Sequence, residues 1–97
     1  MKRRFVVAVD RLTSEQEKAL VAYLKDGGLA WWHWLPGVWL ATTRREDVNA
    51  AQLRDALRDI ARPKRLLVLE VGEHKDWSGI RNDKKMFDWI RSTWAED

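Results

Sequence analysis

Four stretches of the chain have the apolar, β-branched and aromatic character of strands. Residues 5–9 (FVVAV) form a continuous apolar run, which predicts a strand buried on both faces. Residues 29–35 (LAWWHWL) and 38–43 (VWLATT) predict two strands joined by a Pro-Gly pair. Pro presets the first central position of a tight turn, and Gly tolerates the next. Residues 65–71 (RLLVLEV) predict a fourth strand.

A helix is predicted between the first two strands. Ser14 and Glu17 have the spacing of a capping box, which marks a helix start. Gly27 and Gly28 supply the left-handed conformation that commonly ends a helix. Between these signals the apolar residues recur at helical intervals, as Leu20, Tyr23 and Leu24.

Two further helices follow from the same spacing. Residues 49–61 carry an apolar stripe, and Pro63 ends that helix. The stripe consists of Leu53, Leu57 and Ile60. Residues 72–82 are polar and loop-like, and Asp83 can cap a last helix over residues 84–94. The apolar side of that last helix consists of Phe87, Ile90 and Trp94.

The order of these elements is βαββαβ, followed by an added helix. It predicts the α+β class and the ferredoxin-like split βαβ arrangement. In that arrangement two helices cover one face of a four-stranded antiparallel sheet. The chain has 97 residues and no linker, repeat or low-complexity tract. We therefore expect a single ferredoxin-like domain over residues 1–97, with an extra C-terminal helix.

The strands lack the alternation expected of a sheet with one open face. In the first strand, Phe5 and Val7 point one way while Val6 and Ala8 point the other, and all four are apolar. A large apolar surface of this kind usually marks an interface. We expect the last helix, a second copy of the chain, or both to cover it. The predicted interface of this homodimer consists of Trp31, Trp32, Trp34, Trp39, Trp89 and Trp94.

The amino-acid composition excludes several kinds of chemistry and of partner. The chain has no cysteine, so disulfides and thiolate chemistry are excluded, which fits a cytoplasmic location. No apolar stretch approaches the roughly 18 residues of a membrane span, and the apolar run after the basic N-terminus is too short for a signal peptide. We therefore expect no membrane partner. The net charge of +3 permits nucleic-acid contact without demanding it.

Three segments of the chain carry a family resemblance. AWWHWL…VWLATT, LRDAL and RLLVLEVGEHKDWSG are similar to segments of small bacterial and phage proteins labelled SinR-like. That group has a Trp-Trp-His-type second strand and a fourth strand followed by Trp-Ser/Ala-Gly. It is similar in fold to the CRISPR-adaptation endoribonuclease-like family, whose members are ferredoxin-like homodimers. The resemblance covers about residues 5–79 and implies the same fold and a dimer.

The same resemblance draws attention to Asp10. The adaptation-nuclease family has an Asp at the end of its first strand, where the two copies in a dimer can hold a divalent metal. Asp10 would then bind Mg²⁺ and activate water against a phosphodiester; without that activity we expect no cofactor. The SinR-like pattern has a Lys-Pro-Gly turn after this strand, whereas residues 9–13 read VDRLT. The alternative is that Asp10 caps the turn or pairs with Arg11 or a nearby Lys.

Two other segments offer chemistry with an ordinary alternative. His33 lies within the tryptophan run and could act as a general base, although a histidine in that setting is more often packed and hydrogen-bonded. Glu73, His74 and Asp76 could bind a hard cation. Their spacing matches no tight metal loop, and a solvated loop anchored by Trp77 is the alternative.

Basic residues keep nucleic acid among the candidate partners. The candidate phosphate contacts are Arg44, Arg45, Arg54, Arg58 and Arg62, with Lys2, Arg3 and Arg4 at the start of the first strand. Asp55 and Asp59 can pair with this stripe, which would make it a salt-bridged solvent face. Exposed tryptophans can stack bases, but the Lys/Arg-Gly-Phe-type motif of RNA-recognition domains is absent. Core or dimer packing is the alternative for them.

Three functions remain open from the sequence. The first is a small, non-catalytic, dimerising module for binding or assembly, with nucleic acid as one candidate partner. The second is a metal-dependent nuclease that uses Asp10 from both subunits. The third is a phage- or defence-associated module that binds another protein. The ferredoxin-like arrangement itself does not choose among them, because it hosts many functions.

Overall fold

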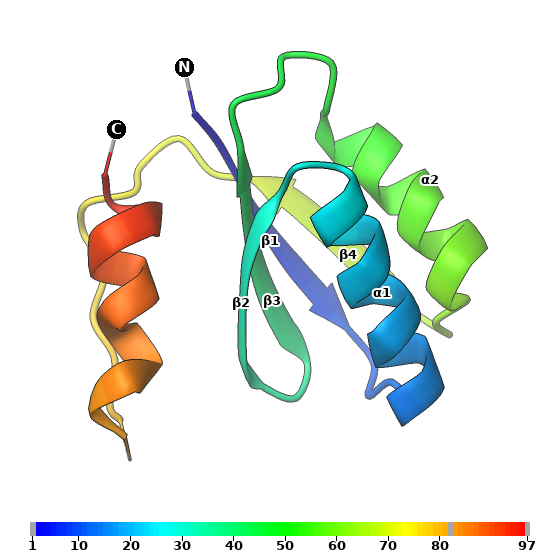
Figure 1. Cartoon of the computed structure of the whole chain (residues 1–97), viewed down its shortest axis with the longest axis horizontal. Helices are drawn as coiled ribbons and strands as arrows, with labels where there is room; N and C mark the ends of the chain where they lie inside the picture. Colours follow the sequence, from blue (N-terminus) through cyan, green and yellow to red (C-terminus); the bar gives the residue numbers. More distant parts are fainter. Residues whose placement is uncertain (1, 82, 97) are drawn as a thin grey trace.

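The chain folds into one antiparallel sheet with helical layers on both faces (Figure 1). The computed structural model describes residues 2–81 and 83–96. The elements are β1 (Arg3–Val9), α1 (Ser14–Asp26), β2 (Ala30–Leu35), β3 (Val38–Thr43), α2 (Ala50–Ala61), β4 (Leu66–Glu70), the 3₁₀ turn η1 (Lys84–Phe87) and the π-helical η2 (Ile90–Trp94). The strand order is β2-β3-β1-β4. The predicted α+β class and the ferredoxin-like order are therefore confirmed.

Helix α1 begins one residue earlier than its predicted capping box. The Thr13 hydroxyl accepts a hydrogen bond from the Gln16 backbone N–H at 3.2 Å, and the Gln16 side chain accepts one from the Thr13 N–H at 2.8 Å. The predicted Ser14–Glu17 capping box was therefore wrong. The stop signal is correct at Gly28, whose φ of 75° is left-handed, whereas Gly27 is right-handed.

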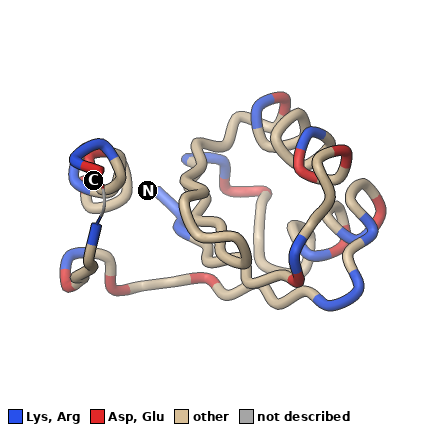
Figure 2. Tube along the Cα trace, turned by 90° about the horizontal axis from the view of Figure 1, so that it is seen from below, with Lys and Arg blue, Asp and Glu red and all other residues tan. Residues whose placement is uncertain are grey.

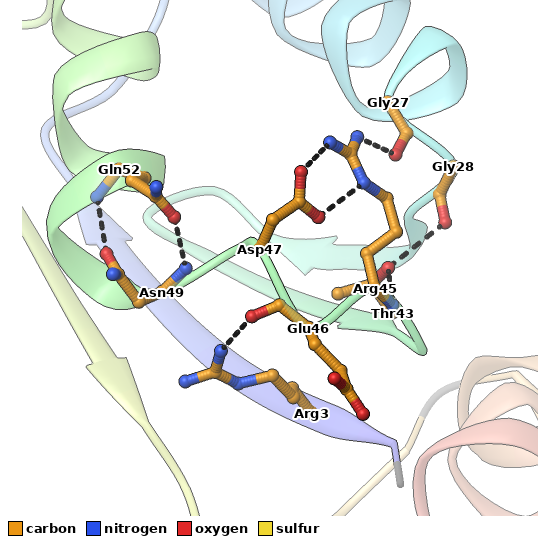
Figure 3. A network of polar contacts seen from close by, with 9 residues as sticks. All are labelled: Arg3, Gly27, Gly28, Thr43, Arg45, Glu46, Asp47, Asn49 and Gln52. Atoms are coloured by element: carbon orange, nitrogen blue, oxygen red, sulfur yellow. Dashed lines mark hydrogen bonds and ion pairs between the residues drawn. The ribbon is translucent and has the colours of Figure 1, made fainter.

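Helix α2 is bounded by clear local signals. It begins at a reciprocal capping box between Asn49 and Gln52, drawn in Figure 3. It ends at Arg62, which has a left-handed φ of 49°. The following Pro63 disfavours the right-handed helical conformation in the residue before it, so the chain turns there.

The buried row of α2 differs from the prediction at one position. Leu53 and Leu57 are buried as expected, and Ala61 continues the row at the same four-residue interval. Ile60 is 42 % exposed, so its predicted place in the buried stripe was wrong. It lies one residue away from the row that faces the sheet, and at 100° per residue that displacement turns its side chain toward the rim.

Helices α1 and α2 cover one face of the sheet. Phe5 and Val7 of β1 and Trp39 and Ala41 of β3 point toward them, and each is at most 2 % exposed. The helices contribute the leucines of their apolar stripes, which are Leu20, Leu24, Leu53 and Leu57. This layer is the main core, and it follows from strand alternation and helix spacing alone.

The C-terminal segment (residues 84–94) covers the opposite face of the sheet. Figure 1 shows it as a separate layer, on the far side of the sheet from α1 and α2. Asp83 caps its start by accepting a hydrogen bond from the Lys85 N–H at 2.8 Å, as predicted. Its buried side chains are Phe87, Ile90 and Trp94, which pack with Trp32 of β2. These three residues are the apolar side that the sequence predicts.

Candidate interaction surface

The predicted interface tryptophans are mostly buried within the chain itself. Trp39 is 2 % exposed and lies beneath α1 and α2. Trp32 is 5 % exposed and lies beneath the C-terminal segment, and Trp94, within that segment, is 6 % exposed. Trp31 and Trp89 are half-buried and pack against these two clusters. Only Trp34 of the six is exposed, at 47 %. The tryptophan run therefore fills two cores on opposite faces of the sheet.

Trp32 attaches the C-terminal segment to β2. Its indole N–H donates to the Met86 carbonyl at 2.5 Å, and its ring stacks on Phe87 with the centroids 6.1 Å apart. Trp77, from the preceding loop, contacts the same phenyl ring at 5.5 Å. An aromatic pair contributes about 0.5–1.5 kcal/mol beyond the area that it buries. The cluster thus fixes the segment over β2 and β3.

The basic N-terminus attaches the other end of this segment. The Arg4 guanidinium is buried and donates to the Trp94 carbonyl at 2.5 Å and to the Glu96 carbonyl at 2.8 Å. Lys2 donates to the Thr93 carbonyl at 2.6 Å. These carbonyls lie at a helix C-terminus, where cations are favourable. Lys2 and Arg4, which the sequence suggested as phosphate contacts, are therefore used inside the chain.

The C-terminal segment leaves part of its sheet face uncovered. In strand register, Trp32, Leu40 and Val6 form a row that packs beneath the segment, and the row continues to Leu69 on β4, which is 52 % exposed. The next row crosses all four strands and contains no buried residue. It runs through Leu35, Val38, Ala8 and Leu67.

We call this region the open sheet surface, and it consists of Ala8, Leu35, Val38, Leu67 and Leu69. Leu35 is 45 % exposed at the hairpin, and Leu67 is 55 % exposed on the edge strand β4. All five side chains are aliphatic, so the surface offers no group for acid–base or metal chemistry. Its chemical capacity is to bury apolar area against a partner.

Asp10 lies at the end of β1, as predicted, but it is engaged by an arginine. Arg65 approaches both carboxylate oxygens, at 2.8 Å and 3.1 Å, in a bidentate ion pair. The Arg65 guanidinium holds the pKa of the Asp10 carboxyl below its usual range. In residues 2–81 and 83–96, no group of three His, Cys, Asp or Glu side chains could hold a metal ion. The geometry corresponds to an ion pair for Asp10, as the alternative expected, but the partner is the distant Arg65 and not Arg11 or a lysine.

The other suggested metal loop is organised by its own backbone. Glu73 accepts hydrogen bonds from the backbone N–H groups of Lys75 and Asp76, at 2.5 Å and 3.0 Å. These two bonds lower the pKa of the Glu73 carboxyl. His74 lies near the Gly72 carbonyl at 3.3 Å. Glu73, His74 and Asp76 therefore form a turn, and the described residues include no metal-ligand set there.

His33 is packed into the sheet. Its ring stacks on Trp39, with centroids 3.7 Å apart and planes 6° apart. Its Nδ1 lies 3.1 Å from the Val38 carbonyl, and its Nε2 lies 3.8 Å from a Glu17 carboxylate oxygen. These contacts correspond to the packed, hydrogen-bonded alternative.

Arg54 and Arg58 of the predicted arginine stripe are paired with neighbouring carboxylates, which corresponds to the salt-bridged alternative. Arg54 pairs with Asp55 at 2.8 Å, and Arg58 pairs with Asp59 at 3.0 Å. Arg45 pairs with Asp47 and also donates to the Gly27 carbonyl, which ties the loop before α2 to the end of α1 (Figure 3). Arg44 is exposed in the same loop, and Arg62 lies at the opposite end of α2. Figure 2 shows basic and acidic positions interspersed along the trace.

A hollow near the start of β1 also carries charged groups. It has a volume of ≈ 590 Å³, and its lining includes Arg3 and Glu70. Arg3 forms a bidentate pair with Glu70 and donates to the Glu46 carbonyl. These two charged side chains of the hollow are therefore paired with each other.

The fold and this surface define a small α+β protein of ferredoxin-like arrangement with a partly covered sheet. Comparisons with protein-family models, with curated proteins and with solved structures gave no match for the chain. The SinR-like resemblance therefore stays a prediction. Within the part of the chain that the structure describes, no helix has the length and apolar character of a membrane span.

Proposed function

We propose that the chain is a non-catalytic binding module that forms a homodimer through its open sheet surface. The observation that carries the proposal is the uncovered row through Leu35, Val38, Ala8 and Leu67, together with Leu69. A small domain has a thin core and gains stability by burying such residues. At about 25 cal/mol per Å², two half-exposed leucines per subunit contribute several kcal/mol to a dimer.

The nuclease alternative would require a rearrangement of the side chains around Asp10. Asp10 would have to leave Arg65, which binds both of its oxygens, before it could bind Mg²⁺. The ligands would also have to come from two copies of the chain, because one carboxylate holds a metal weakly. The binding proposal requires no such rearrangement.

The dimer is tested by changing the two exposed leucines of β4. We expect the natural chain to scatter light at twice its 11.5 kDa mass at micromolar concentration. Leu67→Glu combined with Leu69→Glu should weaken the dimer by at least about 100-fold, since each half-exposed leucine loses about half of the roughly 1.5–3 kcal/mol of full burial and the dimer contains four of them. Sedimentation or light scattering over a dilution series measures the change.

Ile80→Glu is the matched control for this experiment. Ile80 is 95 % exposed in the loop before the C-terminal segment and lies outside the open sheet surface. The same change from an apolar to an acidic side chain should leave its dimer intact. A natural chain that stays at 11.5 kDa across the whole concentration range would contradict the dimer and leave a different protein partner as the better hypothesis.

Nucleic acid is a second candidate partner at one end of the sheet. Backbone hydrogen bonds from Val9 to Gly37 and from Asp10 to Arg65 bring the hairpin turn beside two loops. That end carries the exposed Trp34 and the basic residues Arg11, Arg62, Lys64 and Arg65. An exposed aromatic ring beside cations is the combination that holds single strands.

This second candidate predicts binding that falls steeply with salt. Titration with single-stranded oligonucleotides should quench tryptophan fluorescence, and Arg62→Ala with Lys64→Ala should reduce the salt slope by about one per residue. Arg58→Ala is the control, because Arg58 is already paired with Asp59. The absence of quenching at low salt would exclude this partner and would leave the dimer proposal untouched.

A further inference from the structure

Strand β4 is one of the two edges of the sheet, and its backbone has a definite orientation. Asp10 donates to the Arg65 carbonyl at 3.2 Å, and Val71 donates to the Arg4 carbonyl at 2.8 Å. The odd-numbered residues of this strand therefore bond to β1, because bonding alternates along an antiparallel pair. Leu66, Val68 and Glu70 consequently direct their N–H and C=O groups toward the free edge.

The two edge strands of the sheet differ in how well they are protected against pairing with another strand. Strand β2 has an irregular register between Trp32 and Leu35, and such a bulge twists an edge away from partners. Strand β4 pairs with β1 in unbroken register, and four of its five residues (LLVLE) are apolar. An edge that is regular, apolar and free of proline is a template for another strand. The edge of β4 is therefore the one that favours a partner.

We propose that β4 pairs antiparallel with β4 of a second copy of the chain, with the two-fold axis at Val68. This inference rests on the proposed dimer and confines its contact to the β4 side of the open sheet surface, where Leu67 and Leu69 lie, so that Leu35 on β2 stays outside it. Leu66 then faces the partner's Glu70, and Val68 faces Val68 of the partner subunit. Each such pair exchanges two backbone hydrogen bonds, because these are the residues whose groups point outward. The two sheets become one continuous sheet of both subunits.

This register also accounts for the two exposed leucines. Leu67 lies directly opposite Leu69 of the partner subunit, so the four leucines of the two copies meet on the same face. The charged residue of the strand, Glu70, faces an apolar residue and no like charge. Its ion pair with Arg3, at 2.8 Å, lies toward its own β1 and stays intact.

Neighbouring registers pair fewer residues of β4 with β4 of the second copy. A two-fold axis at Leu67 or at Leu69 also has outward groups facing each other, but it pairs only three residues of β4 directly with β4 of the other copy. The chain bends at residues 64–65, so pairing beyond Leu66 would require that bend to straighten. Only the axis at Val68 pairs the whole of β4 with itself.

The chain has no cysteine, so single engineered cysteines report the register directly. Facing residues in a hydrogen-bonded pair lie about 5.5 Å apart at Cα, within the range that a disulfide spans. Mild oxidation should cross-link most of the Val68→Cys protein into a dimer on a non-reducing gel. Leu67→Cys and Leu69→Cys should each cross-link poorly alone and efficiently when the two variants are mixed. Leu35→Cys, at the β2 side of the open sheet surface, should stay monomeric on the gel.

Hydrogen exchange of the unaltered chain tests the same register without substitution. The Val68 amide should exchange at least tenfold more slowly at concentrations where the dimer forms than after dilution to monomer. The Leu67 amide bonds to β1 and should be protected in both conditions.

The outcomes separate this inference from the proposed function. A dimer by light scattering, with cross-linking at Leu35→Cys but not at Val68→Cys, would overturn β4 pairing and keep a dimer through the sheet face. Efficient self-cross-linking of Leu67→Cys or Leu69→Cys would overturn the register at Val68. A chain that is monomeric by scattering would overturn the dimer and the β4 pairing together.

Discussion

Trp39→Ala should remove about 3–5 kcal/mol of folding free energy, a large part of the roughly 5–15 kcal/mol of a domain this size. The side chain is 2 % exposed, its ring stacks on His33, and it lies in the layer beneath α1 and α2. Its indole N–H is buried without a hydrogen-bond partner among the described residues. The loss therefore comes from packing and the cavity, since no hydrogen bond is broken.

Trp34→Ala is the control for this experiment, because it removes the same side chain from the same hairpin. Trp34 is 47 % exposed, so its truncation should cost less than about 1 kcal/mol. Urea unfolding followed by circular dichroism measures both variants, and the midpoint of Trp39→Ala should fall far below that of Trp34→Ala. Equal losses would mean that the hairpin does not place Trp39 toward the helices.

The fold could be predicted from the sequence because its elements rest on local patterns. The apolar run of β1, the Pro-Gly turn and the helical spacing of Leu53 and Leu57 each fix one element without reference to distant residues. The α1 capping box shows the limit of local signals. Thr13–Gln16 and Ser14–Glu17 both match the motif, and the sequence alone does not decide between adjacent copies.

The interaction surface could be predicted only in outline. The sequence indicated that large apolar groups lie on both faces of the sheet, and it offered two covers for the second face. The choice depends on contacts between distant residues, such as Trp32 with the Met86 carbonyl and Arg4 with the Trp94 carbonyl. Charge patterning does not show such partners, because a backbone carbonyl has no signature in the sequence.

The clearest residue that sequence reasoning missed is Arg4. It stands in the cluster of Lys2, Arg3 and Arg4, which has the composition of a phosphate contact. One signal in the sequence could have distinguished Arg4 from a solvent-exposed phosphate contact. In the alternation of β1, Arg4 falls on the same face as Val6 and Ala8, which is the face that the last helix had to cover.

Arg4→Met should release the C-terminal segment from the sheet. The change keeps an apolar stem but removes the donors to the Trp94 and Glu96 carbonyls, which lie at a helix C-terminus. Hydrogen bonds from a buried charged group contribute about 1.5–3 kcal/mol each when lost. We expect a total loss of about 3–6 kcal/mol, and part of it should appear as local opening, because the main core lies on the other face of the sheet.

Two measurements distinguish local opening from general destabilisation. Chymotrypsin should cut the variant rapidly near Trp89 and Trp94 while the rest of the chain stays protected, and tryptophan emission should shift to the red as Trp32 loses its cover. Arg4→Lys keeps the charge but has fewer hydrogen-bond donors. Its cleavage rate and its emission shift should both lie between those of the natural chain and those of Arg4→Met.

Arg3→Met is the matched control, because it removes a neighbouring arginine from the same strand. The Arg3 side chain is 27 % exposed and pairs with Glu70, itself 41 % exposed, and such pairs contribute about 0.2–1 kcal/mol. The control should keep the cleavage pattern of the natural chain. If Arg4→Met behaves like Arg3→Met in both measurements, the aromatic cluster around Trp32 alone holds the segment. If Arg4→Met opens it, the apparent phosphate-binding motif at the N-terminus serves to keep half of the sheet closed, and the exposed half on β4 remains the surface for a partner.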